Sequence, residues 1–121
     1  MSVFLTISDD RVVYRGDFFF MIYDAYPVSN NHLLIISNEL REDYFSLTAD
    51  EQKELPKMIN KAKSIIEKEI SPDGYNIGMN CGVSSGQTVM HFHCHIIPRF
   101  TGDVDDPRGG VRHCIMHKGY Y

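Results

Sequence analysis

Hydrophobic positions are concentrated in several short runs and in one longer amphipathic segment. The short runs have the length of β-strands and are separated by Asp, Asn, Ser and Gly, which favour turns. The expected strands are residues 11–14, 18–23, 32–37, 75–80 and 91–98, with residues 3–7 as a further short strand or an ordered arm. The run 18–23 is apolar throughout, so we expect it to be buried on both faces of the sheet.

The segment after residue 47 has the pattern of a helix. Thr48 and Glu51 form a capping box at its start, and apolar residues follow at helical spacing at positions 55, 59, 62, 66 and 70. Pro56 lies well inside the segment, so we expect a kink or a restarted helix there. Residues 71–74, Ser-Pro-Asp-Gly, end the helix. One main helix on an antiparallel sheet of about five strands predicts an α+β fold.

Three histidines alternate with apolar residues in the run 91–98, which reads HFHCHIIP. Side chains on a strand alternate between its two faces, so His91, His93 and His95 are expected to project from one face. The residues between them then enter the core, and Pro98 closes the strand. An imidazole titrates near neutral pH and can act as a nucleophile, as an acid or base, or as a metal ligand.

The residues before this strand suit a phosphate group. Residues 82–85 are small and polar and read as a loop that leads into Gly-Gln-Thr-Val at 86–89. A glycine-rich loop of this kind can turn successive backbone N–H groups toward an anion.

The segment 86–97, GQTVMHFHCHII, resembles the signature of the histidine triad superfamily, in which G-Q-[ST]-V precedes H-φ-H-φ-H-φ-φ. The resemblance covers most of the chain and is strongest to the bacterial-type histidine triad hydrolases. Those chains often end in a segment similar to residues 106–112, DPRGGVR. The resemblance implies the α+β fold of that superfamily and a homodimer, since its members are commonly homodimers.

The resemblance also implies a role for four histidines. His93 is expected to attack phosphorus, and His95 to contact the phosphate and the leaving group. His91 and His32 are expected to hold this arrangement, with His32 in a second layer beside the triad. The implied reaction is cleavage at the α-phosphate of dinucleoside polyphosphates or nucleoside phosphoramidates, through a nucleotidyl-histidine intermediate.

Several further residues are implied to contact the nucleotide. Asp24 lies eight positions before His32, where relatives place a group that binds the ribose hydroxyls; a turn-forming Asp before Pro27 is the alternative. Asn80 is expected near the phosphate or ribose, or else as a loop cap, and Ile22 in the base pocket. The loop before the triad is expected to contribute Gly86, Gln87, Thr88 and Val89.

Composition narrows the class of protein. The 121 residues correspond to one domain, 1–121, in which residues 102–121 form a tail that contributes to the site or to a dimer interface. A net charge of −4 speaks against general nucleic-acid binding. The chain has no apolar run long enough for a membrane span and no basic segment of a signal peptide at its start. Three cysteines without a C-x-x-C pair are typical of reduced thiols in a cytoplasmic protein.

Two alternatives to covalent catalysis remain open at this stage. The histidine row could hold zinc, although same-face residues on a strand stand about 7 Å apart and zinc–nitrogen bonds are only about 2 Å long. The protein could instead bind AMP without turnover. Relatives with a structural zinc carry a histidine where Leu40 stands and an N-terminal C-x-x-C, so we expect no structural zinc. The favoured reaction needs no metal and no other cofactor.

Overall fold

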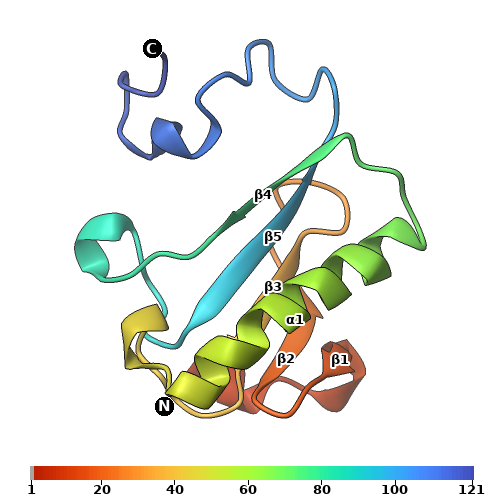
Figure 1. Cartoon of the computed structure of the whole chain (residues 1–121), viewed down its shortest axis with the longest axis vertical. Helices are drawn as coiled ribbons and strands as arrows, with labels where there is room; N and C mark the ends of the chain where they lie inside the picture. The colour runs from red at the N-terminus through yellow and green to blue at the C-terminus, as the bar shows by residue number, and fades with distance from the viewer. Residues whose placement is uncertain (1) are drawn as a thin grey trace.

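A computed structural model describes residues 2–121 and has the predicted α+β architecture, with one long helix lying across a five-stranded sheet (Figure 1). The strand order is β1-β2-β3-β5-β4, and every neighbouring pair is antiparallel. The strands are β1 (Val12–Arg15), β2 (Phe19–Tyr23), β3 (Leu33–Ser37), β4 (Gly74–Gly78) and β5 (His93–Arg99). The helix α1 spans Ala49–Glu67.

The two faces of the sheet carry separate apolar clusters. Alternate residues of the central strands, such as Met21, Ile35 and Cys94, pack under α1. The intervening residues of β2 and β3 form a second cluster on the opposite face: Phe20, Ile22, Leu34 and Ile36. The first four residues of β2 are therefore buried, as their apolar sequence predicts, but the expectation is wrong for the two ends of the run 18–23, because Phe18 and Tyr23 are exposed.

Helix α1 begins as predicted. The Thr48 hydroxyl accepts from the N–H of Glu51, and the Glu51 carboxylate accepts from the N–H of Thr48. The expected restart at Pro56 is wrong, because α1 runs without a break from Ala49 to Glu67. Pro56 is exposed, so its ring meets no neighbouring element and removes only one donor from the helix.

Two boundaries of the histidine strand differ from the prediction. β5 begins at His93, because the Phe92 N–H donates to the carbonyl of Arg41 in a loop rather than to a strand. The strand also continues through Pro98, which pairs with Tyr75 of β4. Ile96 is the last residue of β5 that pairs with β3. The missing N–H of Pro98 therefore leaves no acceptor on β3 without its donor.

Residues near the N-terminus form an ordered arm and not a strand. Val3–Thr6 is a 3-10 helix, η1, whose first turn is capped by the Ser2 hydroxyl accepting from the N–H of Phe4. Phe4 and Ile7 pack against the apolar cluster on the sheet face that α1 leaves open. The arm therefore covers part of this face.

The tail is bonded mainly to itself and lies beside β4 (Figure 1). It contains the 3-10 helix η5 (Gly110–Cys114). Arg112 donates to the carbonyl of Gly119, and the Tyr120 hydroxyl donates to the carbonyl of Asp106. Within residues 2–121, no helix combines the length and the apolar character that a membrane span requires.

Candidate functional site

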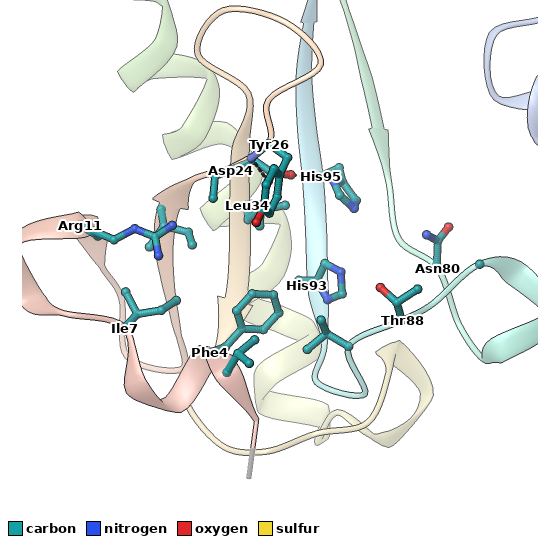
Figure 2. A pocket seen from close by; sticks show the side chains of 15 residues that line it. Phe4, Ile7, Arg11, Asp24, Tyr26, Leu34, Asn80, Thr88, His93 and His95 are labelled. Carbon is teal, nitrogen blue, oxygen red and sulfur yellow. Dashed lines mark hydrogen bonds and ion pairs between the residues drawn. The ribbon is translucent and has the colours of Figure 1, made fainter.

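One row of paired residues crosses the whole sheet and places the candidate site. In register, Val12 of β1 faces Ile22, Ile22 faces Leu34, Leu34 faces His95, and His95 faces Gly78 of β4. Over the open side of this row lies a pocket of about 500 Å³. His93 and His95 line it together with residues from the N-terminal arm and from the loop after β4 (Figure 2).

The tautomer of His93 follows from its hydrogen bond. Its Nδ1 lies 2.7 Å from the backbone carbonyl oxygen of His91. A carbonyl only accepts, so Nδ1 carries the proton and Nε2 carries a free lone pair. Because the ring lines the pocket, this lone pair is the basic nitrogen of His93 available to a ligand.

His91 is fully buried and is held from two sides. Its Nε2 lies 2.7 Å from the carbonyl oxygen of Ser37 and must donate to it, so its Nδ1 accepts from the Ser2 hydroxyl at 2.8 Å. Phe4 packs edge-on against both His91 and His93, with ring centroids 5.6 and 5.1 Å away. The N-terminal arm thus fixes the residue whose carbonyl orients His93.

His32 and His95 form a second hydrogen-bonded pair. The Val28 N–H lies 3.2 Å from Nδ1 of His32, so that nitrogen accepts and Nε2 carries the proton. Nε2 lies 2.9 Å from Nδ1 of His95 and 3.5 Å from the Asp24 carboxylate. His95 therefore accepts at Nδ1 and presents an N–H at Nε2.

Burial favours the neutral forms of His32 and His95. Burial lowers the pKa of His95 to about 4, and the adjacent His32 and His93 add to this effect while Asp24 opposes it. Burial also lowers the pKa of His32, again against the influence of Asp24. The lowered pKa of His32 favours a polar contact of Asp24 with a neutral ring over an ion pair.

The loop before the triad offers fewer backbone amides than its sequence indicates. The N–H groups of Gly86 and Gln87 donate to the carbonyls of Val83 and Gly82 inside the loop. Within residues 2–121, the N–H groups of Thr88 and Val89 have no hydrogen-bond partner, and both residues line the pocket. These two amides are the ones available to an anion.

The structure brings most of the predicted nucleotide contacts to this pocket. Its lining includes Ile22, Asp24, Asn80, Gly86, Thr88 and Val89. Gln87 is different: its side chain is buried, accepts from the N–H of Gly82, and donates to the carbonyls of Glu42 and Val89. This geometry gives Gln87 a part in holding the loop, and its contact with substrate stays a prediction.

One group of potential metal ligands occurs among the described residues, and it is not the histidine row. Asp24, His32 and His95 each offer one ligand atom, and these atoms lie within 4.8 Å of one another. Two of the three, His32 and His95, already satisfy each other by a hydrogen bond.

A family model described as the HIT domain matches residues 6–102. The chain belongs to the HIT family. It is 36% identical over 87 residues to the purine nucleoside phosphoramidase of Escherichia coli, an alignment that covers 71% of this chain and 73% of that protein. It is 32% identical over 102 residues to the AP-4-A phosphorylase of Mycobacterium tuberculosis, but spans only 52% of that longer relative.

Solved HIT-family structures agree with the fold. A HIT family protein from Bacillus anthracis superposes with a TM-score of 0.77 at 31% identity, covering 84% of this chain and 75% of the other. The five-stranded sheet with its one main helix is therefore the HIT fold.

Several lining residues were not among the predicted site residues of this HIT-family chain. They come from the segment before β1, from the turn after β2 and from β3: Val3, Phe4, Ile7, Arg11, Ala25, Tyr26 and Leu34. Their sequence shows no motif, because the arm reaches the site through its packing on the sheet. Only the apolar character of Phe4 and Ile7 indicated that this segment is ordered.

Proposed function

We propose that this HIT-family protein cleaves nucleoside 5′-phosphate derivatives at the α-phosphate through a covalent nucleotidyl intermediate on His93. The observation that carries this proposal is the 2.7 Å hydrogen bond from Nδ1 of His93 to the carbonyl of His91. It leaves the Nε2 lone pair in a pocket that also contains two unpaired backbone amides. A nucleophile, an orienting acceptor and anion-binding donors therefore lie together.

In the first step, Nε2 of His93 forms a bond to phosphorus while the bond from phosphorus to the leaving group breaks. The developing positive charge on the imidazole is shared with the His91 carbonyl through Nδ1–H. The amides of Thr88 and Val89 are placed to bind the phosphoryl oxygens. In the second step, water attacks phosphorus and the bond to His93 breaks, which releases the nucleotide and restores the imidazole.

His95 supports departure of the leaving group. Since its Nδ1 accepts from His32, its Nε2–H can donate a hydrogen bond to the leaving atom. The leaving group takes its proton from solvent, and the attacking water returns one to solvent in the second step, so the reaction consumes one water and is balanced. The substrates that fit this chemistry are dinucleoside polyphosphates and nucleoside phosphoramidates, and no metal or other cofactor takes part.

A second cavity provides room for the leaving group. It has a volume of about 410 Å³, adjoins the first at Asn80 and His95, and is bounded by β4 and by Gly110, Val111 and Cys114 of the tail. We propose that residues 102–121 contribute to the site in this way. We also propose that two chains form a homodimer through the free edge of β4, beside which the tail lies.

The proposal is tested with a fluorogenic adenosine 5′-phosphoramidate. We expect wild-type protein to hydrolyse it and His93→Ala to fall to near background, with AMP binding and the far-UV spectrum retained. His95→Ala should be slowed less, because it loses contacts but keeps the nucleophile. Lys53→Ala, which truncates an exposed side chain of α1 on the opposite face of the sheet, is the control and should keep wild-type activity.

Rapid quenching of the wild type should trap one nucleotidyl group per active site, in an acid-labile and base-stable phosphoramidate that maps to His93. A label on His91 or His95 would show that the roles are wrongly assigned. Substantial turnover by His93→Ala, with no trapped adduct in the wild type, would rule out the covalent route. AMP binding without any turnover would favour a nucleotide-binding module.

A further inference from the structure

Arg11 is the one arginine whose guanidinium has no hydrogen-bond or ion-pair partner within residues 2–121, and it lines the nucleotide pocket. The other arginines are all engaged. Arg112 donates to backbone carbonyls. The other four are paired with carboxylates: Arg15 with Asp9, Arg41 with Glu51, Arg99 with Asp103, and Arg108 with Asp106. The Arg11 guanidinium, in the pocket wall, can therefore donate hydrogen bonds to acceptor atoms of a ligand.

The strand order shows which part of a nucleotide lies near Arg11. Arg11 directly precedes β1, three strands away from β5, whereas Asn80 follows β4 on the other side of β5. Figure 2 shows the same order, with Arg11 and Ile7 on one side of the histidines and Asn80 and Thr88 on the other. Three strand spacings amount to about 14 Å, a span that suits a nucleoside extending from a phosphate held at the histidines.

The pocket wall between the histidines and Arg11 is suited to a planar base. Ile22 and Leu34 form an apolar floor on the sheet, and Phe4 and Ile7 of the arm pack against the same cluster. Asp24 lines the same pocket, with its carboxylate 4.0 Å from Nδ1 of His95. With a phosphate at the histidines and the ribose at Asp24, the base therefore lies over Ile22 and Leu34, and its outer edge is directed toward Arg11.

We propose that Arg11 determines base specificity and selects 6-oxopurine nucleotides, which rests on the proposed function of the site. Guanine and hypoxanthine present two acceptors, O6 and N7, on one edge, and a guanidinium can donate to both at once. Adenine replaces the O6 acceptor by an amino donor, which is repelled by the guanidinium. Arg11 acts on binding and orientation of the base and takes no part in the bond changes at phosphorus.

The test compares guanosine, inosine and adenosine 5′-phosphoramidates that carry the same fluorogenic amine. Wild-type kcat/KM should be higher for guanosine and inosine than for adenosine by about 5- to 100-fold. Arg11→Met, which keeps the length of the side chain and removes its donors, should abolish this difference mainly by raising KM for the oxopurines. Arg15→Met, at a paired arginine on β1 outside the pocket, should keep it.

Each outcome decides the proposal. Equal wild-type kcat/KM for inosine and adenosine, or a preference that survives in Arg11→Met, would overturn it, since inosine shares O6 and N7 with guanosine but lacks the 2-amino group. If the wild type hydrolyses none of the substrates, the proposed reaction has failed. Calorimetric binding of IMP and AMP to wild type and Arg11→Met then tests base selection by itself, and equal affinities of the wild type for IMP and AMP would contradict it.

Discussion

At the scale of residues, single hydrogen bonds determine what each histidine of the site can do. A carbonyl acceptor on Nδ1 leaves the pocket-facing nitrogen of His93 basic, whereas a donor on Nδ1 of His95 leaves its other nitrogen as an N–H. Two neighbouring rings, 5.4 Å apart between centroids, thus offer opposite functions. A backbone carbonyl and the side chain of His32 supply this difference, so histidine spacing alone does not reveal it.

Asp24 provides a residue-scale prediction. One of its carboxylate oxygens accepts from the N–H of Tyr26, and the other is 3.5 Å from His32, and the side chain is 17% exposed. If this carboxylate binds both ribose hydroxyls, Asp24→Ala should raise KM for ribonucleotide substrates far more than it lowers kcat. Such charge-assisted hydrogen bonds contribute roughly 1.5–3 kcal/mol, about 10- to 100-fold in KM.

The control for this prediction uses the substrate, because Asp24 also touches His32. Wild-type protein should bind 2′-deoxyribonucleotide substrates more weakly than ribonucleotides, and Asp24→Ala should no longer distinguish them. Equal KM values for the two sugars in the wild type would refute the assignment of Asp24.

The candidate residues divide into those that a sequence reveals and those that it does not. His93 and its neighbours were predictable, because alternation on a strand fixes which side chains share a face. Arg11 was not, because it belongs to no motif and its place in the pocket follows from the position of β1 in the sheet. Gln87 shows the opposite case. Its place in the motif is clear, but the motif does not show that its side-chain amide is hydrogen-bonded to backbone groups of the surrounding loops.

At the scale of elements, long patterns predicted structure better than short ones. The helix α1 and its capping box follow from many residues acting together, whereas the arm has only four helical residues. At that length a single cap, the Ser2 hydroxyl, decides between a 3-10 turn and a strand. The start of β5 likewise depends on a contact with Arg41, which is distant in the sequence.

The edge strand β4 gives an element-scale prediction about assembly. Among residues 2–121, β4 pairs only with β5, so its outer N–H and C=O groups are available to another strand, and Ile77 on it is 44% exposed. We expect two chains to pair along this edge and the wild type to have the mass of a dimer in solution by light scattering. A lysine on an edge strand opposes such pairing, so Ile77→Lys should shift the protein to the monomer.

The matched control for assembly is Phe45→Lys, which changes another exposed apolar residue in a different element. It should leave the dimer intact. A wild type with the mass of one chain, or a dimer that Ile77→Lys does not weaken, would contradict pairing through β4.

At the scale of the whole molecule, the fold buries several imidazoles that an unfolded chain would expose. Burial lowers the pKa values of His32, His91 and His95 below their ordinary value of 6.5. His95 faces His32 and His93, which favour its neutral form, and Asp24, which favours the charged form. The unfolded chain therefore binds more protons than the folded one once the pH falls below about 6.5.

Acid should consequently destabilise the protein before most carboxylates titrate. The free energy of unfolding should fall as the pH decreases from about 6.5, and for His95 the loss should level off near its folded pKa of about 4. For His95 alone this loss is at most about 3 kcal/mol.

Urea unfolding at pH 7 and pH 5 should show a smaller decrease in the free energy of unfolding for His95→Gln than for the wild type. His117→Asn, at an exposed histidine with φ of 67° that asparagine tolerates, should decrease like the wild type. An identical decrease in His95→Gln would show that burial of His95 does not couple folding to pH.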